Sequence, residues 1–347
     1  MASIGQVRGA LLEESVLHLL GKVGYKIIRE RHDSIDPSDL RLNRAGMEVQ
    51  GRGAWHQIDG LVEQYHTPAF IYPLRLLVEA KCYPSDPVGI GIVRNALGVQ
   101  KDIEENYFTK HLEPSDTSSI RFNYQSAIFS SSSYTKPAME YALAHQIFLI
   151  EYKSIAIIQP LIEAINSCEL SHFAAGQQVN LRRLREDFHG LINGTLQVDS
   201  AQTISIDGRE HVRAAINGLQ QIRGSYFGML QGRWPMHLLT DNELTSEQFS
   251  QDTIRCELHG DVDGWTFSPS GIVDRNDPRW FELQFHLPPQ LVFKMESQWG
   301  DRRRVAQTKS ENFSSISLSG KIGGIWRNVR LELDEDWLRR YLLSTAF

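Results

Sequence analysis

Cysteine is scarce in this sequence, with only three in 347 residues. Cys82, Cys168 and Cys256 lie far apart and form no CxxC pair. This spacing indicates neither a zinc site nor a disulfide framework, because both depend on cysteines at short, regular intervals. Few, widely separated cysteines are typical of a reducing compartment, and we therefore expect a cytoplasmic protein.

An excess of positive charge is also missing. The chain has 36 Lys and Arg residues against 42 Asp and Glu residues, a formal net charge of −6. A protein that coats nucleic acid through charge alone is usually more basic than this. Any contact with nucleic acid must therefore be local, or supported by metal ions.

Long apolar runs are absent as well. Glu13, Glu14 and His18 interrupt the apolar N-terminal segment, which therefore predicts neither a signal peptide nor a membrane span. We expect no membrane partner. What the chain does have is 41% hydrophobic and 10% aromatic residues, which is enough apolar material for a folded protein.

The length of the chain predicts roughly two domains, at about 100 to 200 residues per domain. Near residue 152 the pattern changes from alternating helices and strands to helical material, and then to short β-like runs. Most of the tryptophans follow residue 230. We expect an N-terminal α/β domain over 1–152, a helical connector over 153–198 and a β-rich domain over 199–347 that binds, senses or assembles.

Apolar residues at three- and four-residue steps predict a helix over 9–24, which Gly24 caps. Strands are expected near 25–28, 57–64, 74–81, 126–130 and 147–151, and helices over 88–108 and 136–145. The polar stretch 31–54, rich in glycine, predicts a long loop or insertion. This order of elements is typical of an α/β fold with a mixed sheet flanked by helices.

Three charged side chains in the first part suit chemistry on a phosphodiester. Glu79 and Lys81 end an apolar strand and point to the same face, because strand side chains alternate. Asp59 lies in a strand that can pair beside that one. Carboxylate oxygens suit Mg²⁺, and the backbone carbonyl of Ala80 is a further candidate ligand. Lys81 is a candidate to orient water, to stabilise the transition state or to assist deprotonation.

The same residues have simpler explanations when each is taken alone. A Glu-x-Lys pair at the end of a strand is more often a surface salt bridge. An Asp-Gly pair such as Asp59-Gly60 is more often a turn. The surrounding sequence therefore has to decide whether these residues are catalytic or form only a salt bridge and a turn.

Four blocks of sequence surround this motif in a characteristic order. They are Gly9-Ala-Leu-Leu-Glu13-Glu-Ser-Val16 running to Gly24-Tyr25, the split motif Asp59-Gly60 and Glu79-Ala80-Lys81, the stretch from Val88-Gly89 through Arg94 to Gly98, and Ala127 to Ala138 with Tyr141-Ala142 and Ile147 to Ile150. Together they cover about residues 8–151, and in this order they resemble the Mrr-like branch of the PD-(D/E)xK restriction-endonuclease superfamily.

The resemblance implies a restriction-endonuclease-like fold and metal-dependent cleavage of DNA, with Mg²⁺, or Mn²⁺ in its place, as the cofactor. It implies Asp59, Glu79 and Lys81 as the catalytic set, with Glu13 supporting the metal site. The alternative for Glu13 is a solvated charge on a helix face, and Glu14 is expected to be exposed. The resemblance also implies products with 5′-phosphate and 3′-hydroxyl ends.

Candidates for binding the nucleic-acid backbone are of two kinds. Ser131, Ser133 and Thr135 lie in a serine-rich turn before a helix, where hydroxyl and N–H groups can hold a phosphate. Capping of that helix is the simpler explanation. The basic candidates are Arg94, Arg182, Arg183, Arg302 and Arg303. A run of charges also suits an acidic partner or a solvated surface.

We therefore predict a DNA endonuclease. An Mrr-like nuclease joined to an unfamiliar module is typical of prokaryotic defence, as a restriction or anti-phage effector. Its partners would be the DNA substrate and either a regulatory protein or further copies of the chain. Two alternatives stay open: a non-catalytic nucleic-acid-binding or assembly protein on a nuclease-like scaffold, and an RNA-cutting nuclease with the same site.

Overall fold

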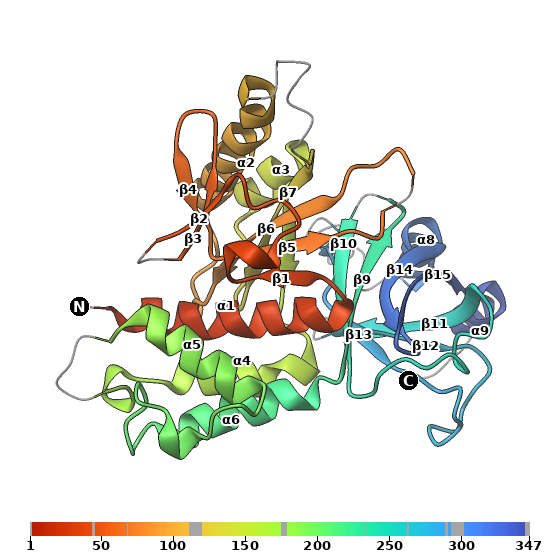
Figure 1. Cartoon of the computed structure of the whole chain (residues 1–347). Coiled ribbons are helices and arrows are strands. Elements are labelled where there is room, and N and C mark those ends of the chain that lie inside the picture. Colours follow the sequence, from red (N-terminus) through yellow and green to blue (C-terminus); the bar gives the residue numbers. More distant parts are fainter. Residues whose placement is uncertain are drawn as a thin grey trace. The chain divides into compact units, whose positions relative to one another are not determined.

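The computed structural model describes residues 2–43, 46–67, 69–110, 120–174, 179–232, 234–261, 264–288, 291–292 and 302–343 (Figure 1). Backbone contacts divide the chain into two compact units. The first comprises Met1–Leu149 and Pro160–Gln220, and the second comprises Ile150–Gln159 and Gln221–Phe347. Both helices and sheets are present, so the chain is a mixed α/β protein, as expected.

A five-stranded sheet in the order β1-β5-β6-β7-β8 forms the centre of the first unit. Its strands are β1 (Lys26–Ile28), β5 (Gly60–Gln64), β6 (Leu74–Lys81), β7 (Asn123–Ser130) and β8 (Phe148–Glu151). β6 pairs antiparallel with β5 and parallel with β7. The sheet is therefore mixed, and the C-terminal ends of β6 and β7 lie at the same edge.

The first helix, α1 (Ile4–Val23), packs on this sheet. It begins at a capping box in which the Ser3 side chain accepts from the N–H of Gln6 and the Gln6 side chain accepts from the N–H of Ser3. It ends at Gly24, whose φ of 117° suits a residue without a side chain. The predicted C-cap is confirmed, and the helix starts earlier than the apolar spacing indicated.

The sheet has two further helices between its strands, α2 (Ile90–Lys110) and α3 (Lys136–Ala144). The long loop expected over 31–54 is wrong. That segment and the residues after it form a second, three-stranded antiparallel sheet of β2 (Leu40–Leu42), β3 (Met47–Gln50) and β4 (Trp55–Gln57). Met47 and Val49 bury one face of β3 in the core, an alternation that the surrounding polar residues obscured.

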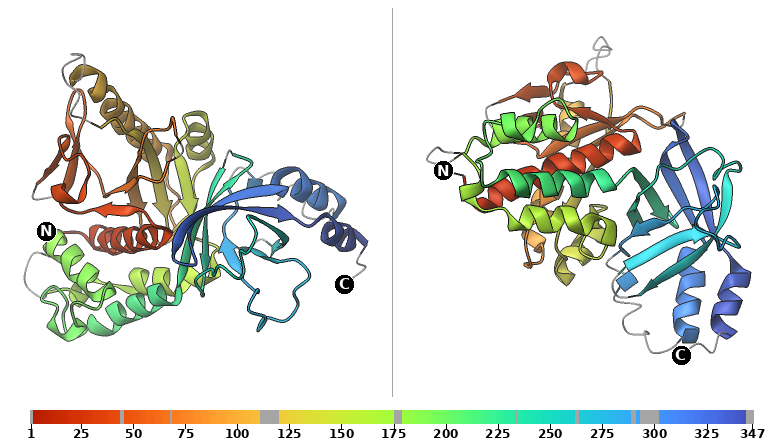
Figure 2. Two further views of the ribbon diagram at one scale, coloured as in Figure 1. Left: turned by 45° about the vertical axis from the view of Figure 1, so that its right-hand side comes forward. Right: turned by 90° about the horizontal axis from the view of Figure 1, so that it is seen from below.

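The helical segment after residue 160 belongs to the first unit, so the expected connector over 153–198 needs correction. Its helices are α4 (Gln159–Ser167), α5 (Leu181–Ile192) and α6 (Arg209–Gln221). α5 lies alongside α1, as Figure 2 shows in green beside red. Leu184, Phe188 and Leu191 of α5 are buried. An amphipathic helix with such a face is stable only when that face is covered, and here it packs in the first unit.

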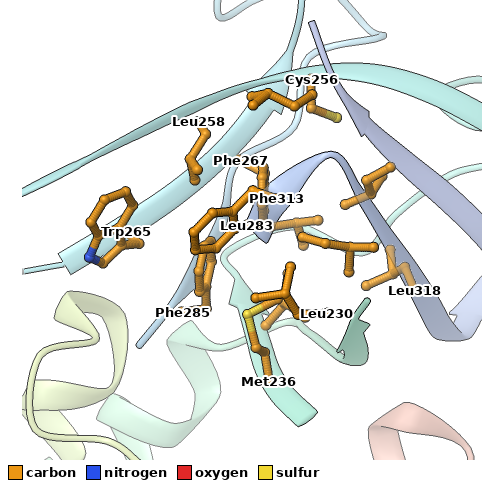
Figure 3. Packing of buried hydrophobic residues seen from close by; sticks show 14 of the residues in the cluster. Leu230, Met236, Cys256, Leu258, Trp265, Phe267, Leu283, Phe285, Phe313 and Leu318 are labelled. Carbon is orange, nitrogen blue, oxygen red and sulfur yellow. The ribbon is translucent and has the colours of Figure 1, made fainter. Parts of the chain in front are cut away.

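The second unit is a closed seven-stranded barrel in the order β10-β13-β12-β11-β15-β14-β9. The strands are β9 (Gly224–Leu230), β10 (Trp234–Thr240), β11 (Thr253–Asp261), β12 (Gly264–Pro269), β13 (Leu283–Phe285), β14 (Ser315–Ile322) and β15 (Ile325–Leu333). Two helices, α8 (Arg302–Phe313) and α9 (Glu335–Leu343), accompany it. Phe267, Leu283, Phe285 and Phe313 gather in its interior (Figure 3). The expected β-rich character is confirmed for this unit, but the expected start at residue 199 is wrong, because residues 199–220, with most of α6, belong to the first unit.

A buried arginine ties the first sheet to the segment before β2. The Arg75 side chain is fully buried beside the equally buried Glu63, with Arg75 Nε 2.9 Å from Glu63 Oε1. Its other nitrogens donate to Tyr124 Oη and Ser34 Oγ, each at 2.9 Å, and its guanidinium stacks on the Phe122 ring. Each guanidinium nitrogen thus has a hydrogen-bond partner, which is the condition for burying a charge without a large loss of stability.

Replacement of Arg75 by methionine is expected to lower the free energy of unfolding by about 3–5 kcal/mol, because it leaves Glu63 buried without its counter-ion. Urea unfolding measured at pH 7 checks this. Lys136→Met is the control, since Lys136 and Glu140 form an exposed pair at 3.9 Å, and it should change stability by less than about 1 kcal/mol. Equal effects of the two substitutions would contradict the role given to Arg75.

Candidate active site

The pairing of β5 with β6 brings Asp59 beside Glu79. Gly60 of β5 lies opposite Val78 of β6 in an antiparallel register, so the residue before Gly60 lies opposite the residue after Val78. The N–H of Ala80 donates to Asp59 Oδ2 at 3.0 Å and holds that carboxylate at the strand end. Asp59 itself lies just before β5. The single strand expected over 57–64 is in fact divided, since β4 ends at Gln57 and β5 begins at Gly60.

Gly60 is needed where α1 crosses this strand. A Cβ atom added at Gly60 would lie 2.6 Å from Cδ2 of Leu17, a buried residue of α1. Real Cβ atoms essentially never make so short a contact, so with any other residue at this position the Leu17 side chain would have to shift. The glycine of the Asp-Gly pair therefore allows close packing of α1 over β5, and it does not mark a simple surface turn.

The Lys81 ammonium contacts the carboxylates of both Asp59 and Glu79. Its Nζ lies 3.6 Å from Asp59 Oδ2 and forms an ion pair with Glu79 Oε1. The three side chains are between 19% and 28% exposed, so they are shielded and still open to solvent. The structure thus brings together Asp59, Glu79 and Lys81, which the sequence separates by up to 22 positions.

The charged groups of this cluster shift the pKa values of Glu79 and Lys81. Burial and the negative charge of Asp59 raise the pKa of Glu79. Burial by itself lowers the pKa of Lys81, but Asp59 and Glu79 outweigh it and raise that pKa. Lys81 is therefore held as an ammonium ion in this arrangement. Its positive charge fits the roles of orienting water or stabilising negative charge better than that of a base.

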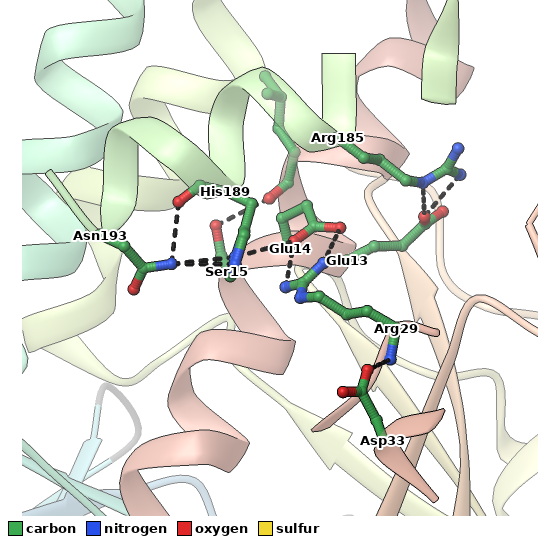
Figure 4. A network of polar contacts seen from close by, with 9 residues as sticks. Glu13, Glu14, Ser15, Arg29, Asp33, Arg185, His189 and Asn193 are labelled. Carbon is green, nitrogen blue, oxygen red and sulfur yellow. Dashed lines mark hydrogen bonds and ion pairs between the residues drawn. The ribbon is translucent and has the colours of Figure 1, made fainter. Parts of the chain in front are cut away.

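Glu13 reaches the cluster from α1. It is 7% exposed, and its Oε2 accepts from Nε of Arg185, on α5, at 2.6 Å (Figure 4). Burial and the charge of Asp59 raise the pKa of Glu13 to about 8, against the opposing effect of Arg185. The solvated helix-face charge that was the alternative for Glu13 is thus wrong, because the carboxyl is buried within the field of Asp59.

Glu14 was expected to be exposed, and this is wrong. It is 2% exposed, and Arg29 donates to both of its oxygens, at 3.0 and 2.6 Å (Figure 4). The segment after β1 carries Arg29 back to α1, and the two-bond contact offsets the burial of the carboxylate. Adjacent glutamates of one helix thus contact arginines from two different elements.

A cavity of about 730 Å³ opens beside the charge cluster. Its walls come from the N-terminal half of α1, from the ends of β4, β5 and β6, and from the start of α5. The lining residues are Ala2, Ser3, Gly5, Gln6, Gly9, Glu13, Gln57, Asp59, Ala80, Lys81, Cys82, Tyr83, Val179, Asn180, Leu181, Arg182 and Arg185. Gly5, Gly9 and Glu13 follow at four-residue steps, so they share one face of α1.

The serine-rich turn after β7 is occupied by structural hydrogen bonds. Ser131 Oγ donates to the carbonyl of Tyr83 and accepts from its N–H, both at 3.1 Å. The carbonyl of Ser133 accepts from the N–H of Val88. Thr135 is the N-cap of α3, so the simpler explanation of this threonine is confirmed. These contacts fasten the end of β6, and binding of phosphate by the turn stays a prediction.

The basic candidates differ in where they lie. Arg182 lines the cavity, whereas Arg183 pairs with Asp187 at 3.2 Å and is not among the lining residues. Arg94 is exposed on α2 and lies over the Tyr141 ring, at 5.5 Å from its centroid. Arg302 and Arg303 begin α8 in the second unit, and their side chains lie outside the described residues.

Asn180 is a lining residue that the sequence did not single out, and Arg185, which belongs to the basic run from Arg182 to Arg185, was not expected to contact Glu13. Arg185 contacts Glu13 across 172 positions, a separation that no local pattern reveals. One signal was present, however. Arg182 and Arg185 are three residues apart on an amphipathic helix and therefore share one face of that helix. Arg183 lies on a different face.

The oxygen donors of the site fit Mg²⁺. Within the described residues, no three His, Cys, Asp or Glu side chains converge as a ready metal-binding group. Asp59 and Glu79 provide a pair, both in contact with the Lys81 ammonium. Mg²⁺ is commonly held by one or two carboxylates, with water and substrate phosphates as the other ligands. The expected Ala80 carbonyl ligand stays a prediction, since the contact seen to Asp59 comes from the Ala80 N–H.

Comparisons with known proteins say little about this chain. No protein-family profile and no curated protein matches it. It is similar to a solved structure titled "Crystal Structure of Protein of Unknown Function AF1548", at 15% identity and a TM-score of 0.35, over 60% of this chain and 95% of that one. At so low a TM-score the likeness supports no conclusion about fold or function. Among the described helices, none has the length and hydropathy that a membrane crossing requires.

The raised pKa of Glu13 predicts a pH-dependent stability. The pKa of Glu13 is about 8 in the folded protein, against an ordinary value of 4.5. Between these two pH values Glu13 is protonated in the folded chain and ionised in the unfolded chain. Its contribution to stability therefore falls as the pH rises from about 4.5 to about 8. Glu13→Gln removes this titration, so the variant should gain stability relative to the wild type between pH 5 and pH 8.5.

Urea unfolding of both proteins in EDTA, at those two pH values, measures the effect. Glu140→Gln is the matched control, because Glu140 is 67% exposed and forms only an exposed pair. A difference between Glu13→Gln and the wild type that stays constant with pH would show that Glu13 is ionised in both folded and unfolded chains.

Proposed function

We propose that this protein is a metal-dependent nuclease that hydrolyses phosphodiester bonds of DNA. One observation supports it most: Asp59, Glu79 and Lys81 meet at one edge of a mixed sheet, beside a cavity of about 730 Å³. Two carboxylates and an ammonium at a strand end suit phosphodiester hydrolysis assisted by a metal ion. The alternative of a strand-end surface salt bridge accounts for the contact of Lys81 with Glu79, but not for the convergence of Asp59 on the same ammonium or for the shielding of all three side chains.

The order of elements supports a restriction-endonuclease-like fold for the first unit. A helix packs on a sheet in which β5 and β6 form an antiparallel pair, β7 joins β6 in parallel, and α2 and α3 lie between strands in the sequence. This is the arrangement that the resemblance to the PD-(D/E)xK superfamily implies. The three-stranded sheet of β2, β3 and β4 is an insertion before the motif.

Each residue of the proposed site has a separate role. The carboxylates of Asp59 and Glu79 hold Mg²⁺, or Mn²⁺ in its place. Bound Mg²⁺ supplies a Lewis acid that neutralises charge developing on the phosphate. Lys81 lines the cavity and presents its ammonium to the phosphate or to the attacking water. Ala80 fixes the Asp59 carboxylate through its N–H, and Glu13 places a buried carboxyl group near Asp59 from the helix side.

The ends of the products and the biological role follow from the family resemblance alone. In-line attack by water on phosphorus, with departure of the 3′ oxygen, gives 5′-phosphate and 3′-hydroxyl ends. A role in prokaryotic defence, with the barrel unit binding a trigger, a regulatory protein or another copy of the chain, stays a prediction.

Cleavage should depend on Asp59 and on Lys81. With Mg²⁺ or Mn²⁺ and circular DNA as the substrate, Asp59→Ala and Lys81→Ala are each expected to lower the cleavage rate by at least about 100-fold. EDTA should abolish cleavage by the wild type. Gel analysis of nicked and linear products measures the rates, and circular dichroism verifies that both variants keep the wild-type fold.

Lys101→Ala is the control, because Lys101 lies on the exposed surface of α2 and pairs with Glu104. It should cleave as the wild type does. If either active-site variant kept full activity, the assigned roles would be wrong. Intact DNA binding without cleavage under any metal would favour the non-catalytic alternative, and faster cleavage of RNA than of DNA would favour the ribonuclease alternative.

A further inference from the structure

We infer that Arg185 is a positioning residue of the candidate active site. From α5 it holds the Glu13 carboxyl group so that Glu13 Oε1 stays beside the cavity and hydrogen-bonds the attacking water. This inference rests on the proposed function and adds a residue to the same site. It makes α5, which lies outside the stretch resembling the nuclease superfamily, a part of that site.

The contact between Arg185 and Glu13 uses only one of the two carboxyl oxygens. Nε of Arg185 donates to Glu13 Oε2, and a second guanidinium nitrogen lies 2.6 Å from the same oxygen (Figure 4). Within the described part of the chain, no hydrogen bond reaches Glu13 Oε1. A Cβ built on Gly9 would lie 3.9 Å from that oxygen, and Gly9 and Glu13 both line the cavity. The free oxygen therefore lies beside a glycine that has no side chain to cover it.

The neighbouring glutamate of α1 shows the difference from a purely structural pair. Arg29 donates to both oxygens of Glu14, at 3.0 and 2.6 Å, and Glu14 is not among the residues that line the cavity. The side chain of Glu13 is buried almost as deeply as that of Glu14. A carboxyl oxygen at this depth needs a hydrogen-bond partner, and for Glu13 Oε1 that partner can come from the cavity.

Glu13 also needs a positive charge in order to lie near Asp59. Burial and the charge of Asp59 raise the pKa of Glu13 to about 8, and Arg185 acts against both. Arg185 thus offsets part of the cost of placing a second acidic group beside Asp59. Without Arg185, the Glu13 carboxyl group would lose the contact that keeps it there.

The helix that carries Arg185 is well anchored. Leu184 and Phe188, on either side of Arg185 in the sequence, are fully buried. Asp187 is buried as well and accepts hydrogen bonds from the N–H and Oγ1 of Thr203, at 3.2 and 2.8 Å. A side chain on a helix held in this way keeps its position better than one on a loop.

Arg185→Gln, in the full chain with Mn²⁺ and circular DNA, tests the role of this residue. We expect kcat to fall about tenfold and KM to stay within about twofold, because the contact positions a reacting group and does not bind the substrate. Arg29→Gln is the matched control, since it breaks the neighbouring pair away from the cavity, and its kcat should stay within about twofold of the wild type. A wild-type kcat for Arg185→Gln would overturn the inference and leave the proposed function standing.

Circular dichroism verifies the fold of each variant. Should Arg185→Gln not fold, Arg185→Lys takes its place, with Arg29→Lys as its control. Lysine keeps the positive charge but loses the second nitrogen of the contact, so kcat should still fall relative to the control. Equal kcat values for these two variants would likewise overturn the inference.

A double substitution separates positioning from a direct contact with DNA. If Arg185 acts through Glu13, adding Arg185→Gln to Glu13→Gln should change neither kcat nor KM by more than about twofold. A rise in KM that persists in the Glu13→Gln background would mean that Arg185 binds the substrate itself, which would overturn the inference.

A measurement without metal or substrate separates this inference from the proposed function. Carbon-13 NMR of the Glu13 carboxyl group in EDTA should show a pKa above the wild-type value of about 8 in Arg185→Gln, because the guanidinium lowers that pKa. Arg29→Gln should leave the pKa of Glu13 unchanged. An unchanged pKa of Glu13 in Arg185→Gln would overturn the inference. If the pKa rises as expected but the wild type cleaves no DNA with any metal, the result counts against the proposed function.

Discussion

The antiparallel pairing of β5 with β6 is the constraint on which the candidate site depends. It sets Asp59 opposite Glu79, and the hydrogen bond from the Ala80 N–H fixes the Asp59 carboxylate there. Two carboxylates so close to each other repel, which is why burial together with Asp59 raises the pKa of Glu79. Lys81 offsets part of that repulsion. A divalent cation would offset more of it, so the cost of assembling the cluster is itself a reason to expect a metal ion.

Part of this arrangement could be predicted from the sequence, because it depends on local periodicity. Alternation along one strand puts Glu79 and Lys81 on the same face, and the order of elements predicts a mixed sheet. The strands β2, β3 and β4 were missed, since each has only three or four residues in a polar background. Arg75 was also missed: a charged residue in a strand predicts an exposed position, and only the three-dimensional partners Glu63, Ser34 and Tyr124 make its burial tolerable.

The helical segment after residue 160 changes the interpretation of the site most. It follows the stretch that resembles a nuclease family, and the sequence therefore favoured a connector. Its amphipathic helices belong to the first unit instead, and α5 brings Arg182 and Arg185 to the cavity beside Lys81. Contacts between residues 172 positions apart depend on tertiary packing, so they are invisible to periodicity. The barrel unit is a separate compact body with its own apolar core, and its role in defence or regulation stays a prediction.

The most direct test of the metal-dependent site is anomalous diffraction from crystals of the full chain soaked in Mn²⁺. A peak about 2 Å from carboxylate oxygens of both Asp59 and Glu79, with Lys81 at its edge and Glu13 still bound to Arg185, is the expected result. Carboxylates of Asp59 and Glu79 that point to different faces of the sheet, or a metal ion bound only elsewhere in the chain, would contradict it.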